Sequence, residues 1–477
     1  MALQRIYLND FAGVRQGVCG GSDPLHWALD AQNVSTQGGC LRRAKGYTPL
    51  LPPMIGDKGK LRRLFVWPQG DGSVDCLVAR QDSLFRYDAA TGSWIDLHHY
   101  AQDRQTDAFD FLKVKIGSTE TVLVGNGLES ILKWPGGSGS VSPFGSAQQQ
   151  SDKAVNFVEL YFNRLFAAGD GEHPARLYWS KAPGGERTIE DWSADEDSEN
   201  VSGGHVEVGT DSDPITGLFA LSNQLLIFKK DRLYRLLGDR PSNFRIVPVE
   251  AALHQPVHTA CVGYGDRLFF LTDRGLYYFD GQTVNRPPHG ADLLPLLGTV
   301  DFSQAVSAAC GDTLYFAVKE DPGSRHNDLV IEYDVLRDCF LLRRGLQVVD
   351  LYGCYGKLYL LSGKGEVALF NEGDTYGGDP IEAYWLAPWL TGASLLTDKQ
   401  AVEAAVVGQG GPVTVSLWGE DGAQGGTGVL LGEGVPREFL LRAGGRRLRF
   451  KLENEQGSDF SITGGVELLI DEQRRVL

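Results

Sequence analysis

One short pattern recurs along this 477-residue chain and constrains its fold more than any other feature. Each copy has a polar or glycine turn, a short apolar strand, a second turn, and a second strand that ends in an aromatic residue and often Asp. The clearest copies are GDRLFFLTDRGLYYFDG, around Leu268, and YGKLYLLSGKGEVALFNEG, around Leu358. Apolar and polar residues alternate within each copy, and this period indicates β-structure.

The spacing of the copies predicts a ring of blades. Successive copies are mostly separated by about 43 to 46 residues, the size of one four-stranded propeller blade. A lone hairpin cannot bury both of its faces, whereas a radial ring of hairpins can, and it leaves few exposed edges. One longer gap holds a Gly/Asp/Ser-rich insertion that we expect to be a loop. The register residues of the copies are Leu77, Val122, Leu165, Leu225, Leu268, Leu314 and Leu358.

The predicted fold is therefore all-β, with a β-propeller of about seven blade-like repeats. Six blades remain an alternative because the copy around Val122 is degenerate. The 60 glycines and 21 prolines, against two methionines, favour many turns and few long helices. A large sandwich or a β-solenoid would also place hairpins at regular spacing. A solenoid would show repeats of about 20 residues, and none is visible.

The repeats divide the chain into three predicted parts. Residues 1–55 are too short and mixed for a domain, so we expect an arm that packs on the propeller and donates a closing strand. Residues 56–375 form the predicted propeller. The repeat stops after Asn371, and residues 376–477 carry alternating strands at roughly ten-residue spacing, which predicts a C-terminal antiparallel β-sandwich. Its Trp385, Trp389 and Trp418 fit core or docking positions better than a ligand cage.

Charge and cysteine usage narrow the possible roles. The formal net charge of −16 argues against a sequence-specific DNA reader, which needs a basic face to neutralise phosphates. It suits a surface over which DNA slides without adhering. The seven cysteines are scattered without a CxxC pair, so a zinc site is not expected. With no signal-like apolar start and no run of about 18 apolar residues, we expect folding in a reducing cytoplasm with free thiols.

Catalytic and cofactor motifs are missing from the sequence. It contains no GxSxG, HExxH, GxxxxGK[ST] or GxGxxG pattern. His98 and His99 are adjacent, and on a strand they would point to opposite faces and not converge on a metal. The repeat copies also share no His or Glu at matching turns, which disfavours a propeller enzyme with Ca²⁺ or a substrate in the central channel. We therefore predict no enzyme, no cofactor, and no catalytic, cofactor-binding or metal-binding residues.

Two groups of charged residues nonetheless require an interpretation. The acidic run within residues 190–200 could hold Ca²⁺ through Glu190, Asp191, Asp195, Glu196 and Asp197, but it lacks the EF-hand spacing, and a solvated loop is the favoured interpretation. Asp211 and Asp213 most simply shape a turn before Pro214. The arginine pairs look too dispersed for one patch, although a few could meet in space: Arg42–Arg43, Arg62–Arg63, Arg343–Arg344, Arg446–Arg447 and Arg474–Arg475.

The order of several segments resembles the β-propeller tail proteins of tailed bacteriophages, the tail nozzle or packaged DNA stabilisation class. Near the N-terminus, FAGV and DPLHWALDAQNVSTQGGCLRRAKGY resemble the opening of that family, with Pro24, Leu25, Ala28, Asn33, Gly39, Leu41, Arg42 and Gly46 in place. The middle likeness is carried by RLYWSKAPGGERTIEDWS, ITGLFALSNQLLIFKKDRLYRLLGDRPSNFRI and FFLTDRGLYYFDG. The tail likeness is carried by YWLAPWL, Lys399, RRLRFKLEN and SITGGVELLIDEQRRV.

This resemblance implies a structural role in the virion tail, with assembly in the host cytoplasm. Several copies, usually six, would form a homo-oligomeric ring that continues the DNA exit channel below an adaptor or tube. The ring would also dock tail fibres or spikes, lie close to DNA without reading it, and not insert into a membrane. The motifs mark architecture, so no site residues follow from them. The alternative is a monomeric propeller that recognises a protein or a glycan through loops such as PGSRHND and GDGEHPAR.

Overall fold

The computed structural model describes residues 2–474 except 17–24, 71–72, 101–103, 146–153, 186, 195–197, 250–257, 393, 395, 421–423, 433 and 441. Within these residues nearly all regular structure is strand. The one α-helix in the described residues is the short α1 (Leu294–Leu297). The 3₁₀ turns described there are η1 (Gln37–Gly39), η2 (Lys58–Lys60), η4 (Glu199–Val201), η5 (Pro241–Asn243) and η6 (His258–Ala260). No helix in this part of the chain is long and apolar enough to cross a membrane.

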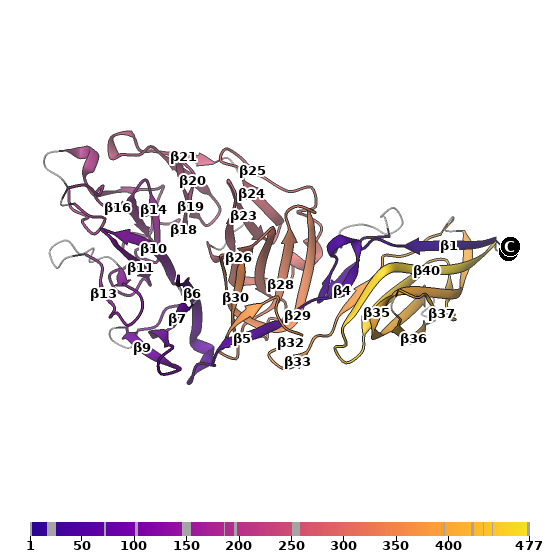
Figure 1. Ribbon diagram of the computed structural model, residues 1–477. Coiled ribbons are helices and arrows are strands. Elements are labelled where there is room, and N and C mark those ends of the chain that lie inside the picture. The colour runs from indigo at the N-terminus through magenta and orange to yellow at the C-terminus, as the bar shows by residue number, and fades with distance from the viewer. Residues whose placement is uncertain are drawn as a thin grey trace.

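Five four-stranded antiparallel sheets follow one another along the chain (Figure 1). The first two are β6 (Leu61–Pro68), β7 (Val74–Arg80), β8 (Ser83–Asp88), β9 (Ser93–His99), and β10 (Asp110–Ile116), β11 (Thr119–Gly125), β12 (Leu132–Trp134), β13 (Ser142–Pro143). The third is β14 (Phe157–Tyr161), β15 (Arg164–Ala168), β16 (Arg176–Trp179) and β17 (Gly204–Glu207). The last two are β18 (Ile215–Leu221), β19 (Gln224–Lys229), β20 (Leu233–Leu237), β21 (Arg245–Val249), and β22 (Cys261–Tyr264), β23 (Arg267–Thr272), β24 (Gly275–Phe279), β25 (Val284–Asn285).

The last two repeats share a nine-stranded sheet. Its strands are β26 (Asp301–Cys310), β27 (Thr313–Lys319), β28 (Asn327–Asp334), β29 (Cys339–Cys354), β30 (Lys357–Ser362), β31 (Val367–Phe370), β5 (Tyr47–Leu51), β32 (Thr375–Tyr376) and β33 (Asp379–Pro380). The first part of the long strand β29 pairs with β28, and its second part, from Val348, pairs with β30. β5 of the N-terminal arm then pairs with β31, as a fourth strand after β29, β30 and β31.

This arrangement confirms the predicted all-β propeller. Each register residue of the repeat lies in the second strand of its group, in β7, β11, β15, β19, β23, β27 and β30. The last group also lies against the first, since the backbone N–H of Leu64 in β6 donates to the Asp350 carboxylate of β29 at 2.7 Å. Apolar side chains fill the space between neighbouring groups, as where Leu77 and Phe65 join Val122 and Trp134 in one buried cluster.

The N-terminal arm and the C-terminal region together form an eleven-stranded sheet. The arm supplies β1 (Ala2–Leu8), β2 (Asp30–Gln32), β3 (Val34–Ser35) and β4 (Leu41–Arg43). The C-terminal region supplies β34 (Tyr384–Leu386), β35 (Thr397–Gly419), β36 (Gln424–Leu431), β37 (Arg437–Leu440), β38 (Gly444–Gly445), β39 (Leu448–Asn454) and β40 (Phe460–Arg474). The long strand β35 pairs with β40 through its first half and with β36 and β39 through its second half.

The arm therefore serves two parts of the molecule. Only β5 joins the propeller sheet, while β1 pairs with β40 and β2 with β34. The physical reason is that alternate side chains along the arm strands are apolar and face inward. Leu8, Val34 and Leu41 are buried in a cluster that includes side chains of the C-terminal strands as well as of the propeller. The C-terminal sandwich and the boundaries at residues 55 and 375 stay predictions.

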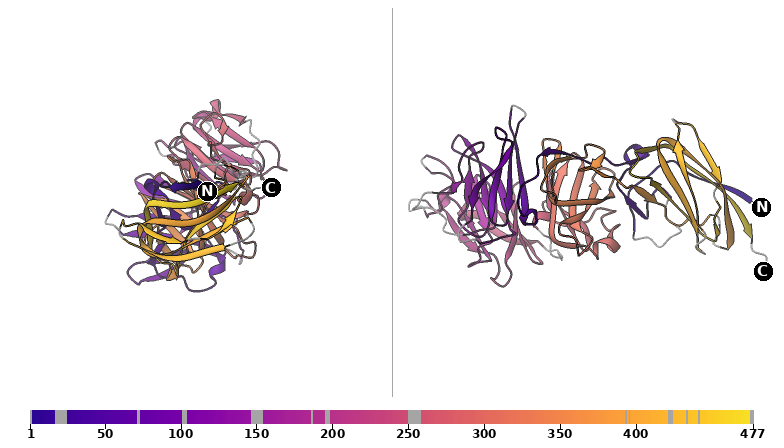
Figure 2. Two further views of the ribbon diagram at one scale, coloured as in Figure 1. Left: turned by 90° about the vertical axis from the view of Figure 1, so that its right-hand side faces the viewer. Right: turned by 90° about the horizontal axis from the view of Figure 1, so that it is seen from below.

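The molecule is elongated (Figures 1 and 2). The propeller lies at one end and the C-terminal sheet at the other, with the arm running between them. Both chain ends lie at the far end of the C-terminal sheet, because β1 and β40 run antiparallel to each other there. The region between the two parts is thus crossed by the arm as well as by the linker after Asn371.

Candidate functional sites at the junction and in the propeller mouth

A continuous apolar core joins the propeller to the C-terminal sheet. Phe11 of the arm contacts Trp385 edge-on, with ring centroids 5.3 Å apart, and Trp385 contacts Phe450 of β39 at 5.6 Å. The same buried cluster includes Phe316 and Phe340 from the propeller. Because interior packing is dense, such a shared core resists bending between the two parts.

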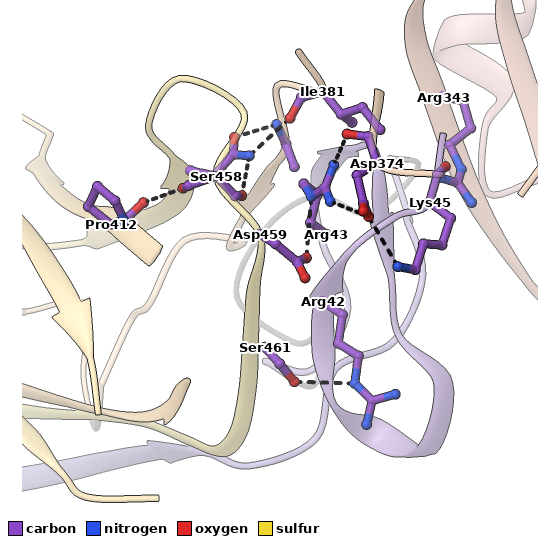
Figure 3. A network of polar contacts seen from close by, with 12 residues as sticks. Arg42, Arg43, Lys45, Arg343, Asp374, Ile381, Pro412, Ser458, Asp459 and Ser461 are labelled. Atoms are coloured by element: carbon purple, nitrogen blue, oxygen red, sulfur yellow. Dashed lines mark hydrogen bonds and ion pairs between the residues drawn. The ribbon is translucent and has the colours of Figure 1, made fainter. Parts of the chain in front are cut away.

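Charged side chains surround this core in a polar network (Figure 3). The side chain of Arg43 is only 2% exposed and forms ion pairs with Asp374 at 3.0 Å and with Asp459 at 3.3 Å. Lys45 also pairs with Asp374, at 3.1 Å, and Arg42 donates from Nε to the hydroxyl of Ser461 at 3.2 Å. One arm segment therefore binds the linker after the propeller and the start of β40 at once.

Asn33 of the arm binds the propeller strand β29, the strand β32 and the segment before β34 at the centre of the junction. Its side-chain amide donates to the carbonyl oxygens of Arg344 at 2.9 Å and Glu382 at 2.7 Å. Its side-chain oxygen accepts from the Arg344 backbone N–H at 3.0 Å and from the Tyr376 hydroxyl at 2.9 Å. The residue is buried and has a φ of 53°, a left-handed conformation that Asn tolerates better than most residues.

Buried ion pairs in the propeller continue this network. Arg343 of β29 donates from Nε to Glu332 of β28 at 2.9 Å, and both side chains are less than one-tenth exposed. Arg343 also donates to the carbonyl oxygen of Lys45 at 3.1 Å, which ties the arm to this strand pair. The neighbouring Arg344 forms two hydrogen bonds with Glu320, at 2.6 and 2.8 Å.

A second candidate site is a cavity in the propeller, called the mouth below. It is lined by residues in or beside the innermost strands of several groups. Its volume is about 820 Å³. Innermost strands contribute Arg63, Phe157 and Thr216, and the segment before β22 contributes His258. Further lining residues are Asp107, Ala108, Phe109, Lys230, Thr259, Thr272, Asp273, Val300, Asp301, Phe302 and Ser303.

Three titratable groups lie close together beside the mouth. The His258 Nε2 is 3.9 Å from Asp110 Oδ2, and its ring lies 5.1 Å from the ring of Phe157. Burial raises the pKa of the Glu159 carboxyl to about 7, and the nearby Asp110 carboxylate acts in the same direction. Gly217 makes room for the His258 ring, since a Cβ there would lie 2.6 Å from His258 Nδ1.

The C-terminal sheet carries an aromatic and basic pocket of about 550 Å³. The guanidinium of Arg449 lies 4.1 Å from the centroid of the Trp389 ring, and Lys451 lies 4.6 Å from the Tyr384 ring. Desolvation, helped by the neighbouring Arg447, lowers the pKa of Arg449. Trp418 also lines this pocket, whereas Trp385 is fully buried in the core, so the three tryptophans do not act as one set.

The first two carboxylates of the acidic run, Glu190 and Asp191, are paired with lysines. Glu190 contacts Lys133 at 2.6 Å, and Asp191 contacts Lys181 at 3.0 Å. Asp195, Glu196 and Asp197 lie outside the described residues. No group of three or more His, Cys, Asp or Glu side chains in the described residues could hold a metal ion.

The remaining residues singled out by the sequence have structural partners. His98 pairs with Glu129 at 3.0 Å, and His99 is exposed. Asp213 lies 3.8 Å from the buried Lys229. Six cysteines lie within the described residues and form no disulfides: Cys40, Cys76, Cys261, Cys310, Cys339 and Cys354.

The structure brings together two arginine pairs that the sequence leaves far apart. Arg42–Arg43 and Arg343–Arg344 both lie at the junction, whereas Arg62–Arg63 lies in β6 and Arg446–Arg447 beside β39. Arg475 lies outside the described residues. Sequence reasoning considered a central channel by comparing the turns of the repeats, but it named none of the residues that line the mouth. The starts of the innermost strands are also recurring positions, and a comparison of those positions could have found Arg63, Phe157 and Thr216.

Comparisons with known proteins add similarity in shape alone. No family model and no curated protein matches this chain. Among solved structures, a computationally designed protein, Ika8, is similar with a TM-score of 0.42 and 10% identity, over 76% of this chain and 99% of that chain. A catalytically inactive virginiamycin B lyase from Staphylococcus aureus, solved with quinupristin, has a TM-score of 0.38 and 11% identity, over 67% and 97%. BamB from Moraxella catarrhalis has a TM-score of 0.38 and 13% identity, over 78% and 98%.

Proposed function

We propose that this protein is a non-enzymatic structural component of a bacteriophage tail. In this role copies of the chain form a homo-oligomeric ring, with six copies favoured, that continues the DNA exit channel. Each copy is a closed ring of seven blades joined to a C-terminal antiparallel sandwich. The ring docks an adaptor or tube above it and fibres or spikes beside it, and it assembles in the host cytoplasm.

The observation that carries the proposal is the way the arm joins the two parts of the molecule. Strands of one 50-residue segment enter both sheets, and Asn33 and Arg43 bind the propeller, the linker and the C-terminal sheet together. A part that transmits load between neighbours needs such a stiff joint, because a plain linker would leave the parts free to move. The residues of the joint include Asn33, Arg42 and Leu41, which also carry the N-terminal resemblance.

The net charge supports the same role. At −16 the chain repels a DNA backbone in general and favours passage over adhesion. The proposed contact with DNA is proximity within a channel, without base reading.

The mass of the assembled particle tests the proposal. Native mass spectrometry of the full chain should give a species about six times the 52.1 kDa chain mass, and negative-stain images should show rings. In virions, a label on this chain should decorate the lower tail. A chain that is monomeric at all concentrations and absent from virions would overturn the proposal.

A further inference from the structure

The strand β39 of the C-terminal sheet buries one face and turns the other towards a pocket. Its residues Leu448, Phe450 and Leu452 are buried. Because side chains alternate along a strand, Arg449 and Lys451 lie on the opposite face. Both line the pocket of about 550 Å³ in this sheet. One side of the pocket is therefore basic.

The neighbouring strands add aromatic and apolar side chains to the same pocket. Trp418 of β35 is directly paired with Arg449, and Leu386 of β34 is directly paired with Lys451. Paired residues lie side by side on one face of a sheet. Trp389 lines the pocket as well. Tryptophan and arginine are enriched among the residues that dominate binding at protein interfaces, so this composition is typical of a docking site.

Arg449 is the one cation at this pocket that lacks a counter-charge among the described residues. The ion pairs Arg447–Glu420 and Lys451–Glu453 neutralise the cations on either side of it. Arg449 itself forms no ion pair and no hydrogen bond with any described residue. Desolvation and the positive charge of Arg447 lower the pKa of Arg449, so its charged form is held at a cost in free energy. An anion bound beside Arg449 offsets this cost.

The free end of Arg449 suits a carboxylate. Its Nε is enclosed, whereas its two terminal nitrogens are accessible and have no partner in the described part of the chain. The guanidinium lies 4.1 Å from the centroid of the Trp389 ring, and this stacking restricts its orientation. A planar guanidinium with two free nitrogens binds a carboxylate through two parallel hydrogen bonds. Because the guanidinium is already restricted, less conformational freedom is lost when the carboxylate binds.

The carboxylates around the pocket limit how many charges a ligand carries. Glu420 and Glu453 are paired with the cations two residues before and two residues after Arg449. Asp30, which lines the pocket, accepts a hydrogen bond from the Tyr384 hydroxyl at 2.6 Å. A nucleic acid strand carries a phosphate at every nucleotide, so it would meet these three carboxylates as well as the arginine. A single carboxylate meets the arginine without that repulsion.

We propose that this pocket docks an acidic peptide segment of a partner protein, in which a carboxylate side chain lies next to a large apolar one. The carboxylate binds the terminal nitrogens of Arg449. The apolar side chain packs against Trp418 and Leu386. One copy of the chain carries the whole pocket, so this inference does not rest on the ring-forming role proposed above.

The experiment uses the full-length protein and short peptides with blocked ends, which carry no terminal charges. The acidic probes are acetyl-Gly-Gly-Asp-Phe-Gly-Gly-amide and the same peptide with Asp and Phe exchanged. The matched probes replace Asp by Asn or Phe by Ala, and a thymidine hexanucleotide represents nucleic acid. Calorimetry and saturation-transfer NMR measure binding. We expect the better acidic peptide to bind about tenfold more tightly than its Asn and Ala counterparts, and more tightly than the hexanucleotide.

Two variants locate the site, and a third is the control. Arg449→Gln removes the positive charge, so the Asp and Asn peptides should bind this variant equally. Trp418→Ala removes one apolar wall and should weaken both peptides about tenfold. Arg267→Gln makes the first change at an arginine that lies 4.8 Å from the Tyr278 ring in the propeller, and it should leave both affinities unchanged. Thermal melting of each variant checks that it folds.

Three outcomes would overturn the inference. If no acidic peptide binds more tightly than its Asn counterpart, Arg449 is not a carboxylate site. If the hexanucleotide binds most tightly, the pocket takes nucleic acid and not protein. If the difference between the Asp and Asn peptides persists in Arg449→Gln, or binding is unchanged in Trp418→Ala, the peptide binds elsewhere. None of these results depends on whether the chain forms rings.

Discussion

The propeller and the C-terminal sheet are both made of antiparallel strands, yet they bury their side chains in different ways. In the propeller, most buried clusters lie between groups of strands that follow one another in the sequence, as with Leu226 and Phe270 in neighbouring groups. One cluster instead closes the last group on the first, where Leu361 packs with Val78. In the C-terminal sheet, β1 and β4 from the start of the chain pair with β40 at its end.

This difference shows that the two parts are held together by contacts of different sequence separation. Contacts between neighbouring repeats close short loops, whereas pairing β1 with β40 brings together residues more than 450 positions apart. The C-terminal sheet therefore depends on the arm, while most groups of the propeller depend on their immediate neighbours.

Trp385→Ala should cause the largest loss of stability and should affect the C-terminal sheet before the propeller. Trp385 is fully buried between Phe11 and Phe450, and truncation of such an aromatic side chain costs about 3–5 kcal/mol of unfolding free energy. Urea denaturation should show the loss, and limited proteolysis should cut the C-terminal strands first. The control is Phe228→Ala, which removes a buried aromatic ring from the propeller and should expose the propeller first. The same cleavage pattern in both variants would contradict the separation of the junction core around Trp385 from the propeller cluster around Phe228.

Arg343→Met should cause the next largest effect, a loss of about 3 kcal/mol of unfolding free energy. The change leaves the buried Glu332 carboxylate without its counter-charge and removes the hydrogen bond to the Lys45 carbonyl oxygen. Urea denaturation measures the loss. Combining Arg343→Met with Glu332→Gln should restore at least half of the lost stability, because no buried charge then remains. A double variant no more stable than the single variant would show that the ion pair is not the source of the effect.

The pH dependence of the propeller should be no larger than this, up to about 3 kcal/mol. Burial raises the pKa of Glu159 from its usual 4.5 to about 7 in the folded protein, so folding favours the protonated carboxyl. The stabilisation is fully present below about pH 4.5 and is lost as the pH rises through about 7. Urea unfolding between pH 4 and 8 should show this decline, measured against Glu159→Gln.

The Glu159→Gln variant isolates the carboxyl from the two titratable groups near it, Asp110 and His258. These groups remain in the variant, so any pH dependence that they cause persists in both proteins. Equal pH profiles for the two proteins would show that Glu159 ionises freely in the folded state.

Arg449→Ala should give the smallest effect, about 0.5–1 kcal/mol. The change removes the guanidinium that lies over Trp389 in the C-terminal sheet. Because Arg447 lies over the same ring at 5.3 Å, part of the interaction remains. Thermal melting and Trp fluorescence measure the change, and Arg267→Ala, which removes a cation near Tyr278 in the propeller, is the matched comparison. A loss several times larger would mean that this pocket contributes to the core.

The sequence by itself determined the repeating part of the fold. Alternation around residues such as Leu268 and Leu358 indicates strands. The mostly regular spacing of the copies indicates one group of strands per repeat, because both signals are local in the chain. The expectation that the arm donates a closing strand also agrees with the pairing of β5 with β31. The sequence did not predict that one long strand, β29, lies between Leu314 and Leu358 and pairs with strands of two groups.

Only the tertiary structure decided where the arm lies and which charges meet. Arg43 has no acidic neighbour in the sequence, and its partners Asp374 and Asp459 are more than 300 residues away. The propeller mouth likewise takes Arg63, Thr216 and His258 from different groups of strands, and none carries a motif. Strand pairing and ring closure between distant segments determine which residues meet at such sites. A pattern of neighbouring residues in the sequence does not predict these long-range contacts.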